Sequence, residues 1–596
     1  MSSDPSGVAV HPETLRQYAL LADGERGALV GPRGDVAFLC APRWHDDAVF
    51  SDLLGGRGTY VVRPADHRFV WGGSYEPHTL IWRSRWVVGA HVLESREALA
   101  YPGDLDRVVL LRHVEALQGD QRVRVFLDAR AGFGSERMRL RRGDDGVWSG
   151  RTGALHLRWT GVPSGDQVEV GRDGSVSFEL RMRQGDRCDL VLEISERTLD
   201  DELPDAMRLW RQTEEGWTSA VPLGRESIAP RDAEHSWAVL RGLTSHAGAM
   251  VAAATTSLPE HSEAGRDYDY RFAWIRDQCF TGQAVAAAGG GDLLESAVTF
   301  VRDRLLDDGP QLVPAYTVDG DRVPDQRPLD LPGYPGAPQV YVGNRVRHQF
   351  QLDAFGESLL LFAAADRLDV LDGDGWKAAE LAVDAIVQHD GEPDAGIWEI
   401  QSQRWAHSRL ICAAGLRAVA RRRERRAAEW MALADKIVAD AAQDCVHPSG
   451  RWQRSPDDEN VDAALLLPAI RGAVPADDPR SVATWRAVIE DLATDGYVYR
   501  FRHRPGPLNQ AEGAFVLCGF HMALATHQQG DRLGAVRWFE RNRGALGPPG
   551  LFTEEFDVVQ RQLRGNLPQA FVHALLIEAA HTLTDDNPRR WHEQGF

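Results

Sequence analysis

Cysteine is scarce in the sequence, and its spacing suggests neither a disulfide framework nor a metal site. Only six cysteines occur in 596 residues, and no two of them form a CxxC pair. Most of them stand within apolar runs, which predicts buried free thiols and gives no reason to expect a metal or another cofactor. The six are Cys40, Cys188, Cys279, Cys412, Cys445 and Cys518.

Long apolar runs and positive net charge are also missing. No run approaches the length of about 18 to 20 apolar residues that spans a membrane, and the N-terminus lacks a basic region followed by an apolar core. The formal net charge of −20 argues against nucleic acid or an anionic membrane surface as a partner. We therefore expect a cytoplasmic protein that acts on a neutral small molecule. The sequence leaves open whether the chain forms a homo-oligomer.

The first third of the chain is typical of strands, with short alternating runs interrupted by Gly, Asp and Pro. Residues 168–170 and 176–182 flank Gly171 to Gly174, which predicts a hairpin whose apolar residues share one face. Residues 121–127 alternate in the same way. This pattern predicts an antiparallel β-sandwich over residues 1–220, followed by a linker over 221–234.

The remaining residues, 235–596, have the periodicity of helices. Leu352, Phe355, Leu359 and Phe362 form one apolar stripe with steps of three and four residues. Comparable stripes recur near residues 237–253, 280–304, 375–388, 408–422, 427–443, 480–493, 511–527 and 568–584. About eleven or twelve helices joined by alternately long and short loops predict an all-α barrel of helical hairpins closed into a ring. The long loops are expected to gather at one end, where a site would lie.

Residues 266–277, RDYDYRFAWIRD, carry most of the polar chemistry of their region. Aromatic side chains at Tyr268, Tyr270, Phe272 and Trp274 recur with a period of two, which places them on one face of an extended chain. The opposite row is rich in charge. Aromatic rings can contact the C–H faces of a sugar, and carboxylates and guanidinium groups can bind its hydroxyls, so the pattern favours a carbohydrate site. The alternative is a buried strand edge with two ion pairs.

Two glutamates in later loops have the chemistry that glycoside hydrolysis needs. Glu399 follows Trp398 before a predicted helix, and a neighbouring indole can raise the pKa of a carboxylic acid to suit a general acid. Glu554 lies in the loop before the last helix and could be the matching base. Each glutamate could instead be a helix N-terminal carboxylate stabilised by the helix dipole.

Several stretches together resemble glycoside hydrolase family 15, the glucoamylase, glucodextranase and trehalase family, and the likeness covers nearly the whole chain. The stretches are residues 254–260, 267–277, 342–344 with 349–357, 396–399, 511–515 and 553–557 with 565–569. Residues 38–43 also resemble the sandwich domain of that family. One such match would be a weak signal, but six in the right order make a strong one.

The resemblance implies a β-sandwich followed by a barrel of six helical hairpins (an α/α toroid), acting with inversion on an α-linked, non-reducing terminal glucose. It implies that Glu399 is the general acid and Glu554 the general base. The carboxyl groups of an inverting pair stand about 6.5 to 9.5 Å apart. The remaining roles that the resemblance implies are hydroxyl binding by Arg276 and Asp277, an aromatic shell of Tyr270, Trp274 and Trp398, and a leaving-sugar side lined by Arg500 and Glu512.

The chain departs from the family pattern at a few positions, so the substrate stays open among trehalose, isomalto-oligosaccharides and malto-oligosaccharides. Gln401 stands where Arg is frequent, Ala413 where an aromatic is common, and residues 36–38 where the family usually has Ile-Asp-Trp. Two other classes remain. A disaccharide phosphorylase of similar architecture would need a phosphate site in place of the base, and a non-catalytic sugar-binding relative would have lost one of the two glutamates.

Overall fold

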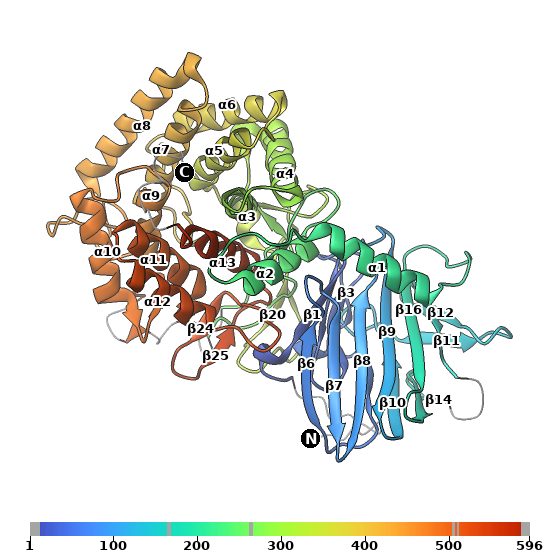
Figure 1. The fold of residues 1–596 in the computed structure, drawn as a ribbon. Coiled ribbons are helices and arrows are strands. Elements are labelled where there is room, and N and C mark those ends of the chain that lie inside the picture. Colours follow the sequence, from blue (N-terminus) through green and yellow to red (C-terminus); the bar gives the residue numbers. More distant parts are fainter. Residues whose placement is uncertain (1–11, 164–167, 262–265, 504–506, 509–511, 586–596) are drawn as a thin grey trace.

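An antiparallel β-sandwich is followed by a domain of helices (Figure 1). The computed structural model describes residues 12–163, 168–261, 266–503, 507–508 and 512–585. Within these residues, no helix is both long enough and apolar enough to cross a membrane.

The sandwich consists of two sheets of eight strands each. The first has the order β1 (Ala19–Ala22), β2 (Gly27–Val30), β3 (Asp35–Cys40), β5 (Thr59–Pro64), β10 (Gln121–Asp128), β15 (Val176–Met182) and β14 (Glu169–Val170), with β4 (Ala48–Phe50) paired to β3. The second has the order β11 (Met138–Arg142), β12 (Trp148–Thr152), β13 (Leu155–Thr160), β16 (Arg187–Ser195), β9 (Arg107–Gln118), β8 (His91–Leu99), β7 (Trp82–Val88) and β6 (Val70–Tyr75). The fold class expected from the strand pattern is confirmed.

Alternation along the strands builds the core between the sheets. In β10, Val123, Val125 and Leu127 are buried, whereas Arg122, which precedes Val123, is exposed. The predicted hairpin is present, because Val170 pairs with Val176 across the turn between β14 and β15. Apolar residues of both sheets form one cluster, so the sandwich has a core of its own.

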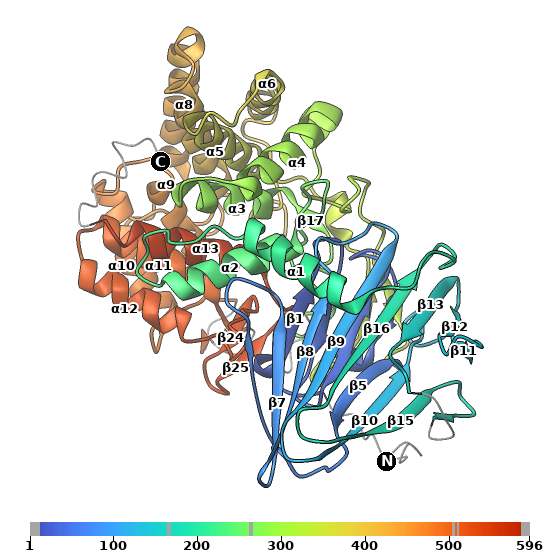
Figure 2. The same cartoon turned by 45° about the vertical axis from the view of Figure 1, so that its right-hand side comes forward.

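Helix α1 (Ala206–Ala220) covers part of the sandwich and leads to the helical domain (Figure 2). Its buried side includes Trp210 and Trp217. The Trp217 ring stacks on Tyr101 with centroids 4.1 Å apart, and the Arg96 guanidinium lies over the Trp210 ring. The segment after the last sandwich strand is therefore fixed by aromatic contacts.

The helical domain has an inner ring of six helices within its described residues. The inner helices are α3 (Ile275–Ala287), α5 (Asp353–Arg367), α7 (Ala406–Ala420), α9 (Leu467–Ile470), α11 (Val516–Gln528) and α13 (Ala570–Thr582). Each contacts the next, and α13 contacts α3, so the ring is closed. Because inner helices touch neighbours on all sides, α3 and α13 are buried around almost their whole circumference.

An outer helix precedes each inner helix in the sequence. The outer helices are α2 (Pro230–Leu243), α4 (Asp292–Asp308), α6 (Gly373–Gln388), α8 (Glu424–Asp444), α10 (Pro479–Leu492) and α12 (Arg532–Arg543). Apart from α2, whose second half is buried on all sides, they bury one side only. Helix α8, for example, buries Trp430, Ala434, Ile437 and Ala441 at helical spacing. This arrangement confirms the ring of helical hairpins that the periodicity predicted, and their number is the six that the resemblance implied.

Two predicted helices have different limits in the structure. The stripe at 280–304 is divided between α3 and α4, because Gly289, Gly290 and Gly291 all adopt positive φ angles that end the first helix. The stripe at 237–253 belongs to α2, which ends at Leu243. Residues 249–253, beyond the end of α2, are buried without being helical.

Short strand pairs connect the loops at the ends of the inner helices. They are β17 (Ala273–Trp274) with β18 (Ala315–Tyr316), β19 (Arg327–Leu329) with β20 (Val340–Val342), β21 (Ala493–Thr494) with β22 (Tyr497–Val498), and β23 (Ala514–Phe515) with β24 (Glu555–Asp557) and β25 (Gln562–Arg564). Apart from β17, which lies in residues 266–277 that were expected to be extended, the sequence pattern predicted no strands here, since two or three residues are too few to show a period.

Candidate active site

Most of the predicted site residues lie where the chain enters an inner helix. Arg276 and Asp277 occupy the first turn of α3, and Glu399 precedes α7. The expectation of an extended chain continuing to Asp277 was wrong, because α3 begins at Ile275, whose backbone N–H donates to the Pro314 carbonyl at 2.9 Å. The alternation therefore applies only up to Trp274.

Glu399 is held in an unusual backbone conformation at the candidate site. Its φ of 55° lies in the left-handed region, which a glutamate rarely adopts. The loop around it is fixed by Asp394, whose carboxylate accepts a hydrogen bond from the Gly396 N–H at 2.7 Å and whose carbonyl accepts one from the Trp405 indole at 2.9 Å. The glutamate side chain is thus presented from a constrained turn.

Two donors orient the Glu399 carboxyl group. The Trp274 indole donates to Oε1 at 2.6 Å, and the Arg276 guanidinium donates to the same oxygen at 3.2 Å. Arg276 is itself fixed by Gln351 at 2.6 Å and Asp353 at 3.5 Å. The predicted acid and two predicted sugar-binding residues therefore contact one another directly.

Asp277 lies beside this group with one free acceptor. Its side chain is buried, and Oδ1 has no hydrogen-bond partner among the described residues. Burial raises the pKa of Asp277 to about 7; the Arg276 charge opposes this and the Glu399 charge adds to it. A buried acceptor without a partner is well suited to a ligand hydroxyl.

Glu554 lies against a tyrosine and a second glutamate. The Tyr270 hydroxyl donates to Glu554 Oε1 at 3.3 Å and lies 3.5 Å from Glu260 Oε1. Burial, reinforced by the Glu260 charge, raises the pKa of Glu554 well above its ordinary value. Burial also raises the pKa of Glu260, against the opposing charge of Arg500. Two neighbouring buried carboxyl groups favour holding one proton between them.

Tyr270 and Trp274 connect the two predicted catalytic glutamates. Their rings meet edge to face, with centroids 5.5 Å apart and planes at 87°. Trp274 donates to Glu399 and Tyr270 donates to Glu554, so one short segment contacts both carboxyl groups. The expected separation of about 6.5 to 9.5 Å between these carboxyl groups stays a prediction.

The other two aromatics of the segment differ in position. Tyr268 is partly exposed and stacks on Tyr270, with centroids 6.2 Å apart. Phe272 is buried, and its ring lies 6.0 Å from His45 of the sandwich. Phe272 also shares an apolar cluster with Trp274, against which Tyr270 packs, so the expected aromatic face includes Phe272.

Trp398 and Arg500 lie together on another side of the site. The Trp398 indole donates to Asp462 at 2.9 Å, and its ring meets Phe515 edge to face at 5.3 Å. The Arg500 guanidinium lies 5.6 Å from the Trp398 ring and 4.4 Å from the Phe515 ring. These contacts fix the indole plane next to Glu399.

Arg500 is the centre of a buried charged cluster. It contacts Glu512, Glu555 at 3.4 Å and Glu260 at 3.7 Å. Burial by itself raises the pKa of Glu512, but Arg500 and His503 outweigh it and lower that pKa to about 2. Glu512 is therefore ionised near neutral pH, and Arg500 links it to Glu260, the neighbour of Glu554.

Several residues of the site carried no assigned role in the sequence. Glu260 lay inside a matching stretch, but nothing local indicated its contact with Glu554, which is far away in the chain. Gln351 and Asp353, which hold Arg276, lay in another matching stretch. Asp462 had no sequence signal. Among the described residues, no group of three or more His, Cys, Asp or Glu side chains is arranged to hold a metal ion.

Models of known protein families match both parts of the chain. Residues 239–581 match the model of glycosyl hydrolases family 15, and residues 8–205 match the model of trehalase-like N-terminal domains. A trehalase of Mycobacterium tuberculosis is 30% identical, with 95% of this chain and 89% of that protein covered. A trehalase of Mycolicibacterium smegmatis is 29% identical, with 95% and 90% covered.

The fold has a counterpart among solved structures. A bacterial glucoamylase complexed with acarbose superposes with a TM-score of 0.71 at 14% identity, covering 98% of this chain and 96% of that one. At this identity the likeness concerns the fold alone. Because the family model covers more than half of the chain, the chain belongs to glycosyl hydrolase family 15 and is a glycoside hydrolase.

Proposed function

We propose that the protein is an inverting, exo-acting α-glucoside hydrolase that releases β-glucose from the non-reducing end of short α-glucosides. Trehalose is the first candidate substrate, because both trehalases compared above align along nearly their whole length. Isomalto- and malto-oligosaccharides are the other candidates. We also propose domain limits of 1–220 for the sandwich, 221–234 for the linker and 235–596 for the catalytic barrel.

One observation carries the proposal: a single segment contacts both predicted catalytic glutamates. Trp274 donates to Glu399 and Tyr270 to Glu554, and the two rings are in contact. Two carboxyl groups oriented from a common rigid support are what an acid and a base on opposite sides of one glycosidic bond require. This supports catalytic roles over the alternative of isolated helix-terminal carboxylates.

In the proposed reaction, Glu399 gives its proton to the glycosidic oxygen as the bond from that oxygen to C1 breaks. Glu554, as a carboxylate, takes a proton from the water whose oxygen bonds to C1 from the opposite face. The products are β-glucose and the free leaving sugar. The step leaves Glu399 ionised and Glu554 protonated, so Glu554 loses its proton to solvent and Glu399 takes one up before the next turnover. Tyr270 would help to place the water, since its hydroxyl lies at Glu554.

The binding roles follow from the same contacts. Arg276 and Asp277 would hold the hydroxyls of the terminal glucose, because Arg276 contacts Glu399 and Asp277 has an unpartnered buried oxygen within the described residues. Trp274, Tyr270 and Trp398 would surround the sugar ring. Arg500 and Glu512 would line the side of the leaving sugar.

The test is hydrolysis of trehalose, isomaltose, maltose and a longer dextrin by the wild type and by Glu399→Gln and Glu554→Gln. Each substitution is expected to lower kcat by about 100- to 10,000-fold, because it removes one partner of the proton transfer. The control is Glu392→Gln, an exposed glutamate at the start of the Glu399 loop, which is expected to keep full activity.

Each reaction is run with and without inorganic phosphate. Free glucose as the product in both conditions supports the hydrolase. Glucose 1-phosphate would instead assign the protein to the phosphorylases, and no turnover of any of the four sugars by the wild type would contradict the proposed function.

A further inference from the structure

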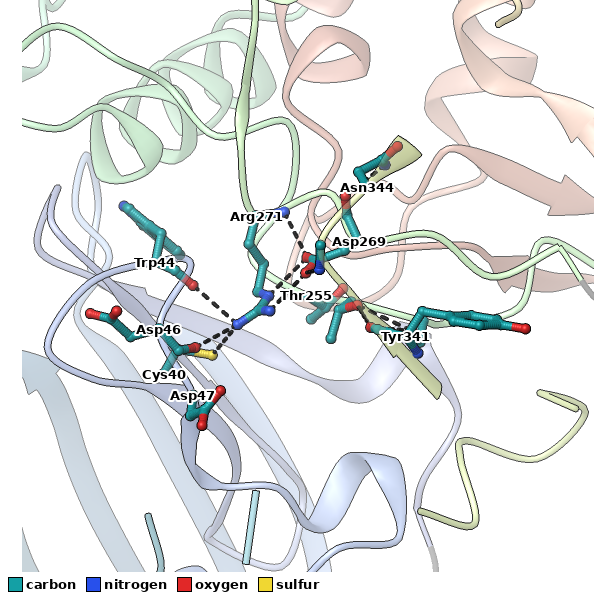
Figure 3. A network of polar contacts seen from close by, with 12 residues as sticks. Cys40, Trp44, Asp46, Asp47, Thr255, Asp269, Arg271, Tyr341 and Asn344 are labelled. Atoms are coloured by element: carbon teal, nitrogen blue, oxygen red, sulfur yellow. Dashed lines mark hydrogen bonds and ion pairs between the residues drawn. The ribbon is translucent and has the colours of Figure 1, made fainter. Parts of the chain in front are cut away.

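Besides the contact of Phe272 with His45, residues 266–277 reach the sandwich through a buried guanidinium group. Arg271 lies in residues 266–277, between Tyr270 and Phe272, and its side chain extends away from the barrel toward the sandwich loop 41–47 (Figure 3). The side chain is 2% exposed. A buried guanidinium requires several partners to offset its lost hydration.

On the sandwich side, three acceptors surround one nitrogen of Arg271. NH1 donates to the Asp46 carbonyl at 2.7 Å, to the Cys40 sulfur at 3.1 Å and to the Trp44 carbonyl at 3.4 Å. Trp44 is fully buried, and its indole donates to the Gly24 carbonyl at 2.9 Å. The end of β3 and loop 41–47 therefore provide a fixed binding site for the Arg271 side chain.

On the catalytic side, the same guanidinium pairs with Asp269. Nε donates to Asp269 Oδ1 at 2.9 Å and NH2 donates to Oδ2 at 2.7 Å. Asp269 Oδ2 also accepts from the Gly343 N–H at 2.9 Å, and Asn344 donates to the Asp269 carbonyl at 3.1 Å. The guanidinium thus joins three separate parts of the chain in one network (Figure 3).

The position of Arg271 next to Tyr270 gives this network a functional consequence. In an extended segment, consecutive side chains point to opposite sides. Tyr270 points to Glu554 and Glu260, and Arg271 points to the sandwich. Rotation of the segment about its own axis would move the Tyr270 hydroxyl, and the contacts of Arg271 oppose that rotation.

We propose that Arg271 is a positioning residue through which the β-sandwich sets the orientation of Tyr270 against Glu554. Resting on the proposed function, this assigns the sandwich a part in catalysis beyond structural support. A shift of about 1 Å at a catalytic contact can cost about a hundredfold in rate, so a small loss of orientation is measurable.

The test compares three single variants and the Arg271→Lys/Cys40→Ala double variant, all full length, at a temperature well below every Tm. Arg271→Lys keeps the charge opposite Asp269 but cannot reach both sides of the network. Cys40→Ala removes one sandwich acceptor and leaves the catalytic domain unchanged. Leu80→Ala is the control: Leu80 is buried at the contact with Gly242 of α2, so its truncation weakens the domain interface away from residues 266–277.

We expect Arg271→Lys to lower kcat on the preferred α-glucoside about tenfold or more, with KM changed less than about twofold. The acidic limb of the pH profile is expected to move to higher pH, because the Tyr270 hydrogen bond lowers the pKa of Glu554 and its loss raises that pKa. Cys40→Ala should act in the same direction by about threefold, and the double variant should lose less than the product of the two effects. Leu80→Ala should lower Tm and leave kcat and the pH profile unchanged.

Near-ultraviolet circular dichroism sums over all 18 tryptophans and 11 tyrosines, so the readout is the difference between the spectrum of each protein and that of its Tyr270→Phe counterpart. This difference isolates Tyr270 without turnover, and it should change in Arg271→Lys but not in Leu80→Ala. Unchanged kcat, pH profile and dichroism in Arg271→Lys with a lowered Tm would overturn the inference, as would a loss of kcat in Leu80→Ala equal to that in Arg271→Lys. If Arg271→Lys does not fold, unchanged kcat and pH profile in Cys40→Ala overturn it. A wild type that cleaves no α-glucoside contradicts the proposed function, and the dichroism still decides the positioning role.

Discussion

Glu260 sets the charge environment of the predicted base. It shares the Tyr270 hydroxyl with Glu554, and its negative charge adds to burial in raising the pKa of Glu554. If Glu554 must be a carboxylate to accept a proton from water, activity is lost as pH falls through that raised pKa. Under the proposed function, we therefore expect Glu260 to move the acidic limb of the pH profile to higher pH, in addition to the larger effect of burial.

Replacing Glu260 by Gln removes this neighbouring charge, so the pKa of Glu554 should fall and the acidic limb of kcat/KM should move to lower pH. We expect a shift of about one pH unit, typical of a close carboxylate neighbour. A pH profile of kcat/KM for the variant and the wild type measures it. A limb that stays in place or moves to higher pH would contradict the pairing of Glu260 with Glu554.

At the residue scale, the sequence was informative where a residue and its local pattern carry the chemistry. Glu399 next to Trp398, and the aromatic spacing around Tyr270, could be recognised from the chain alone. The partner of Glu554 could not, because Glu260 comes from a distant loop and looks like an ordinary turn glutamate. Contacts of this kind form only when the barrel closes, so no local sequence pattern indicates them.

At the scale of the elements, helices α5 and α7 are in close backbone contact at Gly356. A Cβ at Gly356 would lie 2.6 Å from the Ile411 carbonyl carbon and 2.7 Å from the Cys412 nitrogen, and these are backbone atoms that cannot turn aside. Gln351 and Asp353, which hold Arg276, stand at the start of α5, and Glu399 precedes α7. The packing of these two helices therefore bears on the site.

Gly356→Ala should force α5 and α7 apart and destabilise the fold by about 1 to 3 kcal/mol. Thermal unfolding should show a lower Tm, and kcat should fall with it. The control is Gly373→Ala in the first turn of α6, where a Cβ meets nothing within 4 Å and a gain in helix propensity should keep or raise Tm. Equal Tm values for both variants would show that the close approach is not required.

At the same scale, helix number and type followed from the 3.6-residue period, because the outer helices have one apolar side. Helix ends were less accurate. The break between α3 and α4 depends on three successive glycines with positive φ, and an apolar stripe continues across it. The two- and three-residue strands at the loop ends were not predictable, since pairing with a distant segment defines them.

In the whole molecule, the order of strands followed by helices predicted a sandwich and a helical ring. It could not show that loop 41–47 of the sandwich holds Arg271 beside the site. Closure of the ring brings α13 against α3 and thereby brings the Glu554 loop to the Tyr270 segment. The sandwich, the first inner helix α3 and the loop before the last inner helix α13 thus meet at the proposed catalytic centre.

The most direct test of the account is time-resolved proton NMR of the wild type with α,α-trehalose, which follows the anomers of glucose before they mutarotate. Inversion at one C1 predicts equal initial amounts of β-glucose, from the attacked ring, and α-glucose, from the leaving ring, with or without phosphate. Isomaltose or maltose serves in the same way if trehalose is not cleaved, with β-glucose in initial excess. α-Glucose alone from trehalose would mean retention and would contradict the pairing of Glu399 as acid with Glu554 as base.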